Sequence, residues 1–220
     1  MSRSKVLLSV LVLLAISSCG STSTTTDSST TTESATTTES PTASTGYART
    51  VNGFTIKRYA DLVGADLAGA DLVAADLADA DLSNANLSGT NLYMAYLFGA
   101  DLVGTNLRNA NLFGATLSGV DLSNADLTNA NLEYVELFGA NLNGANLTNA
   151  HLSNANLSGA NLFGTNLSGA NLTNAFLSYV HLFLADLSGA NLTGANLDGT
   201  KLYDNINLSG ATMPDGTIHD

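Results

Sequence analysis

Residues 60–89 read ADLVG-ADLAG-ADLVA-ADLAD-ADLSN-ANLSG, and this five-residue pattern continues without interruption to residue 204. Leucine occupies the central position of all 29 units, from Leu62 to Leu202. The residue two positions before each leucine is alanine in 22 of the 29 units and threonine or valine in the others. The repeat covers about two thirds of the 220 residues, so its period decides the fold.

A five-residue period fits neither an α-helix nor a flat β-strand. On a helix, successive leucines would be turned by about 140°, so the row would spiral around the cylinder. On a strand, they would alternate between opposite faces. Only a chain that turns once per unit buries every leucine, and this geometry is a solenoid whose units bury their apolar sides by stacking.

The block resembles the pentapeptide-repeat family, whose unit is Ala-(Asp/Asn)-Leu-x-x, as in residues 65–69. The resemblance implies an all-β fold: a right-handed, quadrilateral parallel β-helix with one unit per side and 20 residues per coil. The leucine and the small residue two before it would point inward, and the other three positions would face solvent. Glycine and asparagine dominate the last position and tolerate the unusual φ of tight corners.

Both ends of the repeat block carry sequences expected to cap it. The predicted N-terminal cap is 47–59, where residues 51–56 alternate apolar and polar side chains like a short strand over the first coil. The predicted C-terminal cap is 205–220. There the leucine register slips by one residue, from Leu202 to Leu208, and residues 213–216 (Met-Pro-Asp-Gly) predict a turn.

The sequence of the first 46 residues predicts an export signal followed by a tether. A basic start, an apolar run over 6–16 and the sequence Ile-Ser-Ser-Cys ending at Cys19 resemble a bacterial lipoprotein signal peptide over 1–18. This resemblance implies cleavage before Cys19 and attachment of acyl chains there, which anchor a protein durably. The alternative is an ordinary signal peptide cut elsewhere. Residues 19–46 are rich in Ser and Thr and predict a disordered tether, with glycosylation left open.

The composition argues against catalysis and against nucleic-acid binding. A net charge of −12 disfavours phosphate as a partner. His151, His181 and His219 are far apart in the sequence, and no catalytic motif accompanies them, so we expect no enzyme, cofactor or metal site. A column of like charges one coil apart is expected on one side, and we interpret it as a solvated acidic face, with bound cations or raised pKa values as the alternative. The column comprises Asp61, Asp81, Asp101 and Asp121.

Aromatic residues are unevenly distributed over the four predicted sides. Eight of the eleven aromatic residues in the repeats fall on two adjacent sides. Another side carries Phe163, Phe183 and Tyr203, and the remaining side has no aromatic residue. An outward apolar cluster is typical of a contact surface, whether for an unknown protein or for a homodimer. The alternative is that the rings shield the backbone at the corners. The candidate surface, on two adjacent sides, comprises Tyr93, Tyr96, Phe98, Phe113, Tyr134, Phe138, Phe176 and Tyr179.

These patterns predict a non-enzymatic lipoprotein, held to a membrane through Cys19 and facing outside the cytoplasm, that presents a rigid acidic rod as a structural or protein-binding module. The competing hypothesis is DNA mimicry, since some pentapeptide-repeat proteins resemble duplex DNA and protect a topoisomerase. The acidic rod fits mimicry, but the export signal does not, because topoisomerases act in the cytoplasm.

Overall fold

A computed structural model describes residues 48–220. The predicted signal peptide (1–18), Cys19 and the tether (19–46) lie outside the described residues. Over the range 48–220, no helix has both the length and the apolar character needed to cross a membrane.

The chain enters through a β-hairpin instead of the single strand predicted over 51–56. Strands β1 (Arg49–Val51) and β2 (Phe54–Ile56) pair antiparallel, with Val51 opposite Phe54. The prediction was wrong because Asn52-Gly53, a strong signal for a two-residue hairpin turn, divides the segment. Both turn residues have positive φ, at 50° and 83°. Ile56 is buried in the core, and Val51 and Phe54 pack against it.

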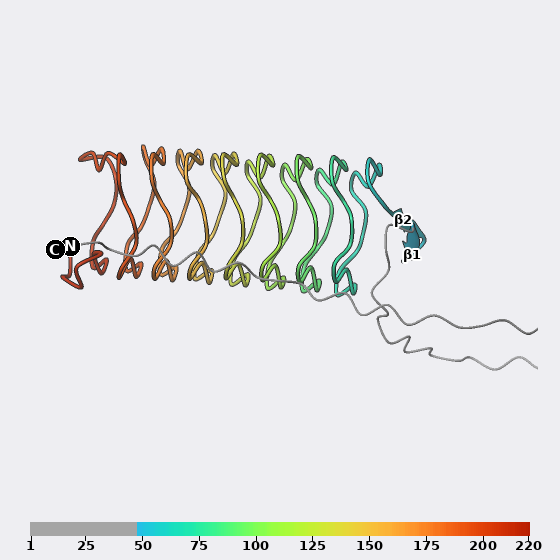
Figure 1. The fold of residues 1–220 in the computed structure, drawn as a ribbon, viewed down its shortest axis with the longest axis horizontal. Coiled ribbons are helices and arrows are strands. Elements are labelled where there is room, and N and C mark those ends of the chain that lie inside the picture. Colours follow the sequence, from blue (N-terminus) through green and yellow to red (C-terminus); the bar gives the residue numbers. More distant parts are fainter. Residues whose placement is uncertain (1–47) are drawn as a thin grey trace, which may run out of the picture. The chain divides into compact units, whose positions relative to one another are not determined.

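From residue 60 the chain forms a four-sided stack of coils, with β1 and β2 at one end and the C-terminal coils at the other (Figure 1). From Asp61 to Phe176, parallel bridges join each residue before a leucine to the residue 20 positions further on. The first four are Asp61–Asp81, Asp66–Asn86, Asp71–Asn91 and Asp76–Tyr96. These four bridges define the first, second, third and fourth sides. One five-residue unit therefore forms one side, as predicted.

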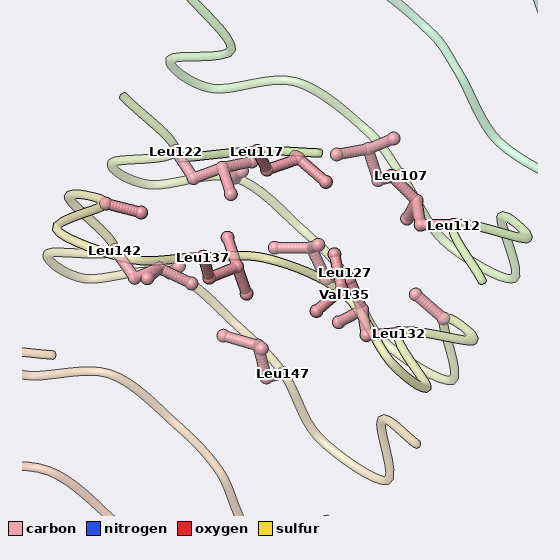
Figure 2. Packing of buried hydrophobic residues seen from close by; sticks show 14 of the residues in the cluster. Leu107, Leu112, Leu117, Leu122, Leu127, Leu132, Val135, Leu137, Leu142 and Leu147 are labelled. Atoms are coloured by element: carbon pink, nitrogen blue, oxygen red, sulfur yellow. The ribbon is translucent and has the colours of Figure 1, made fainter. Parts of the chain in front are cut away.

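Between the two ends, the interior is formed by the leucines and the small residues that precede them by two positions. Every central leucine from Leu62 to Leu192 is buried, and the leucines of neighbouring units pack together along the axis (Figure 2). Backbone hydrogen bonds fix the coils to one another. For example, the Leu102 N–H donates to the Asp121 carbonyl at 2.7 Å, and the Asp126 N–H donates to the Thr105 carbonyl at 2.9 Å.

The last position of every unit from Gly64 to Gly199 has positive φ. This confirms that these residues form the corners, and it explains why glycine and asparagine dominate the position, since most other residues are strained there.

The C-terminal end differs from the prediction in two ways. Leu197 is only partly buried and Leu202 is 42% exposed, so the last two leucines do not both point inward. Thr200 is still bonded to the preceding coil, and residues 201–205 then form a bulge with one extra residue. The coil then resumes in residues 206–215, because the bridges Asp186–Asn207 and Asn191–Thr212 span 21 residues instead of 20.

The predicted turn over 213–216 is confirmed and closes the chain. The Met213 N–H donates to the Thr217 carbonyl at 2.7 Å, and the His219 N–H donates to the Ala211 carbonyl at 2.8 Å. This closing hairpin covers backbone groups that would otherwise remain free at the open end of the stack.

Candidate functional site

The aspartate or asparagine before each leucine has two structural tasks, although the sequence predicted it to be simply solvent-facing. Within a unit, its side-chain oxygen accepts a hydrogen bond from the N–H two residues on, as in Ser83 to Asp81 at 3.0 Å. Between coils, asparagine side chains bond to one another, as in Asn106 Nδ2 to Asn86 Oδ1 at 3.1 Å. A net contribution of about 1 kcal/mol is usual for such a bond.

On the fourth side, several coils lack these side-chain hydrogen bonds. The N–H groups of the residues two positions after Tyr96, Thr116, Glu136 and Phe176 have no side-chain acceptor among the described residues. The column of residues before the leucines on this side runs Asp76, Tyr96, Thr116, Glu136, Asn156, Phe176 and Asn196. Its one side-chain bond between coils in the described residues joins Asn156 Nδ2 to Glu136 Oε2 at 2.8 Å.

Aromatic rings gather at the corner between the third and fourth sides. On the third side, Tyr93 and Phe113 stack with centroids 5.5 Å apart and planes 13° apart, and Phe113 lies 5.3 Å from Tyr134 in a tilted pair. Such contacts contribute about 0.5–1.5 kcal/mol beyond burial. The three rings therefore form one continuous ridge over three coils.

The fourth side of these coils carries three further exposed aromatic residues. Tyr96 and Phe98 follow Tyr93 in the same coil. Two coils further on, Phe138 follows Tyr134. Each of these rings is more than 40% exposed, whereas Phe113, between its two neighbours, is half-buried. Six of the eight predicted contact residues thus lie on the third and fourth sides of three successive coils, with Phe98 and Phe138 next to the far corner of the fourth side. Together with the exposed Met94 they form what we call the corner patch. The patch comprises Tyr93, Met94, Tyr96, Phe98, Phe113, Tyr134 and Phe138.

The other two predicted residues are separate from the corner patch. Phe176 lies in the fourth-side column four coils after Tyr96, and Asn156 stands between it and Glu136. The Tyr179 ring lies over Gly199, with ring carbons where a Cβ at that glycine would be. A second aromatic pair, Phe163 and Phe183, stacks on the first side with centroids 5.7 Å apart.

Two glutamates lie beside residues of the corner patch. Glu136 lies between Tyr134 and Phe138 in the sequence, and Glu133 precedes Tyr134. Among the described residues no lysine or arginine forms an ion pair with either glutamate; the nearest basic group is His151 Nδ1, 4.0 Å from Glu133 Oε1. The basic residues that do pair, Arg58 and Arg108, bind aspartates elsewhere on the coils.

A model of pentapeptide repeats matches this chain in eight copies within residues 60–215. This is more than half of the chain, and it covers the coils described above. The chain belongs to the pentapeptide-repeat family. The fold of this family is a quadrilateral β-helix, in agreement with the four sides observed here.

Solved pentapeptide-repeat structures are similar to the chain. HetL, involved in heterocyst differentiation regulation in the cyanobacterium Nostoc sp. strain PCC 7120, is 38% identical, with 74% of this chain and 82% of HetL covered and a TM-score of 0.41. QnrB1, a plasmid-mediated fluoroquinolone resistance protein, is 23% identical, with 67% and 75% covered and a TM-score of 0.41. Rfr23 of the cyanobacterium Cyanothece 51142 is 40% identical, with 49% and 63% covered and a TM-score of 0.28. A search of curated proteins found no match to this chain.

Four corners of this pentapeptide-repeat protein carry large apolar residues at positive φ: Met94, Tyr134, Tyr179 and Leu184, with φ between 55° and 60°. All four are exposed by about half or more. The left-handed conformation costs a non-glycine residue about 1–2 kcal/mol. Because these side chains are exposed, burial of apolar surface offsets little of this cost. Two of them cover the corner glycine of the next coil, Met94 over Gly114 and Tyr179 over Gly199, as expected if such side chains shield the backbone.

The acidic column predicted on the first side is present, since bridges join Asp61 to Asp81, Asp81 to Asp101 and Asp101 to Asp121. The alternative of raised pKa values is wrong for Asp81. The hydroxyl and N–H of Ser83 donate to its Oδ1 at 2.7 and 3.0 Å and lower the pKa of this carboxyl. At Asp121, burial favours a higher pKa, but bonds from Ser123 and Asn141 outweigh it and the pKa is lowered.

The histidines are dispersed over the structure. His151 is on the third side and His181 is on the first, each replacing the usual Asp or Asn before a leucine, while His219 lies in the closing hairpin. Within residues 48–220 no group of three or more His, Cys, Asp or Glu residues is arranged to hold a metal ion.

Proposed function

We propose that this protein is a non-enzymatic lipoprotein that displays a rigid, right-handed β-helical rod outside the cytoplasm and binds another protein through the corner patch. The lipobox-like sequence ending at Cys19 and the Ser/Thr-rich stretch over 19–46 support the anchor and the tether. Several acyl chains on one residue would hold the chain on the membrane.

One observation carries the binding role: the repeat is abandoned on the fourth side beside the exposed rings. The fold is stabilised by Asp or Asn before each leucine, yet Tyr96, Thr116 and Glu136 replace it in three successive coils. Local violations of a structural rule without a structural gain are typical of functional positions. The corner patch occupies the surface where this loss occurs.

The alternative, a DNA mimic that protects a topoisomerase, finds some support in the acidic column of the first side. The charge is, however, concentrated at one end. Before the leucines of the first 14 units there are eight aspartates, whereas asparagine predominates from Asn141 onward and Asp186 is the one aspartate there. A mimic of duplex DNA needs charge along its whole length, since DNA carries one at about every 1.7 Å of axis.

Two experiments test the proposal. First, the native host is grown with labelled palmitate and fractionated. We expect the protein to carry the label and to be found in the membrane fraction. The Cys19→Ser variant should be unlabelled and absent from that fraction. A protein that remains soluble and unlabelled would contradict the anchor and favour the cytoplasmic alternative.

Second, partners are cross-linked on the surface of the native host, and wild type is compared with the Tyr96→Ser/Phe138→Ser variant. We expect one specific cross-linked product in wild type that the variant loses, while Asp81→Asn/Asp101→Asn, on another side, keeps it. An unchanged product in the Tyr96→Ser/Phe138→Ser variant would contradict binding through the corner patch.

A further inference from the structure

We infer that the partner presents a cationic polypeptide segment, and specifically arginine side chains, to the corner patch. This inference rests on the proposed binding function and names the chemical class of the partner. It depends on the arrangement of aromatic rings and unpaired carboxylates at the corner between the third and fourth sides.

The first argument is charge. Glu133 and Glu136 lie in the same coil as Tyr134 and Phe138, and neither has a lysine or arginine partner among the described residues. On the first and second sides, one oxygen of Asp81 accepts two bonds from Ser83, and the two oxygens of Asp126 accept bonds from Thr128 and Arg108. Glu136 receives only the bond from Asn156 at 2.8 Å on one oxygen. Its other oxygen is therefore free to accept a bond from a partner.

The second argument is the combination of rings with carboxylates. The column of the fourth side places Tyr96 between Asp76 on one side and Thr116 and Glu136 on the other. A guanidinium stacks on aromatic rings and donates to a carboxylate in two parallel bonds. Arginine therefore fits both components of the corner patch, whereas an anionic or purely apolar segment fits one at most.

The third argument excludes a second copy as the occupant. The six rings of the corner patch together expose roughly 600 Å², taking about half of 150–250 Å² for each ring. A stable interface buries about 800 Å² on each partner. A two-fold dimer through this patch would also bring Glu133 and Glu136 of each copy toward those of the other, and like charges at an interface are strongly unfavourable.

The test measures binding of fluorescein-labelled octa-arginine to the purified full-length protein by fluorescence anisotropy, at about 150 mM salt, where surface charges are screened beyond about 8 Å. Two variants install the residue that the repeat itself uses, so that the fold is retained. Glu136→Asn should weaken binding about tenfold, as expected for loss of a charged hydrogen bond. Tyr96→Asn should weaken it about two- to fivefold through loss of a cation–π contact.

The control is Asp81→Asn/Asp101→Asn, which removes two carboxylates from the first side and should change the affinity by less than about twofold. Octa-lysine should bind more weakly than octa-arginine, because lysine lacks the planar group. Equal loss of affinity in the control and in Glu136→Asn would show binding to net charge alone and would overturn the inference.

Light scattering adds a further outcome. If the mass of wild type is twice that of the chain, and Tyr96→Asn restores the monomer, the occupant is a second copy and the inference is wrong. A last outcome is that octa-arginine binds neither wild type nor the variants, while the cross-linked partner is still lost from Tyr96→Ser/Phe138→Ser. The class of partner is then wrong, and the proposed binding function stands.

Discussion

Replacing Leu137 with alanine tests the packing of the leucine interior at the middle of the stack. Leu137 is fully buried, and its N–H donates to the Asn156 carbonyl at 2.8 Å, so the backbone around it is held by the next coil (Figure 2). Because the coil is fixed in this way, neighbouring leucines cannot collapse into the space left behind. We expect a loss of about 3 kcal/mol, within the range measured for buried leucines.

The assay is urea unfolding followed by circular dichroism. With a slope of about 2 kcal/mol/M, the loss of about 3 kcal/mol should lower the urea midpoint by about 1.5 M. Leu202→Ala is the matched control: it has the same place in the repeat but is 42% exposed, so it should cost less than about 1 kcal/mol. Equal midpoints for the two variants would refute the assignment of Leu202 to the bulge and of Leu137 to the interior.

Three further predictions concern the surface positions. Asn111→Asp should destabilise the protein by about 1–2 kcal/mol, because Asn111 Nδ2 donates to Asn91 Oδ1 at 3.0 Å; Asn143→Asp, at an exposed position with no side-chain bond in the described residues, should have little effect in the same urea assay. Leu184→Asn should raise the melting temperature by about 2–4 °C, because it relieves an exposed leucine at φ 60°; a lower value would show that Leu184 stabilises the fold. Acidification should lower the melting temperature as the pH falls from about 5 to about 2. Burial of Asp126 favours a higher pKa, but bonds from Thr128 and Arg108 lower the pKa of this carboxyl in the folded protein. The stabilisation from Asp126 is therefore present above the pKa of the unfolded state and is lost as the pH falls through the pKa of the folded state. Asp126→Asn should flatten this pH dependence, and an unchanged pH dependence would contradict the role of these bonds.

The period of the repeat was sufficient to predict the interior and the corners. Leucine at every fifth position left one arrangement, and the positive φ at the last position follows from the glycine and asparagine found there. The errors came at both ends, where the period stops. At the N-terminal end the Asn52-Gly53 turn divided a predicted strand, and at the C-terminal end one extra residue moved Leu202 outward.

The candidate surface was only partly predictable, because the sequence assigns residues to sides but not to contacts. Counting units placed Tyr93, Phe113 and Tyr134 on one side, and the structure adds that their rings touch. Counting also grouped Phe176 and Tyr179 with them, although both lie further along the stack. Met94 was missed because methionine was not among the aromatics considered, yet its positive φ marks the same corner.

The role of the aspartate and asparagine column was not predictable from the repeat alone. The sequence predicted a position facing solvent, whereas the structure shows side-chain bonds within and between coils. This gives Tyr96, Thr116 and Glu136 their significance, because each replaces a stabilising residue.

The most direct measurement therefore compares wild type with the Tyr96→Asn/Thr116→Asn/Glu136→Asn variant, which restores the repeat along the fourth side. We predict an unchanged or higher melting temperature, because bonds within and between coils are regained, together with loss of octa-arginine binding by more than about tenfold. A markedly lower melting temperature with unchanged affinity would show that these three residues stabilise the coil and do not form a binding surface.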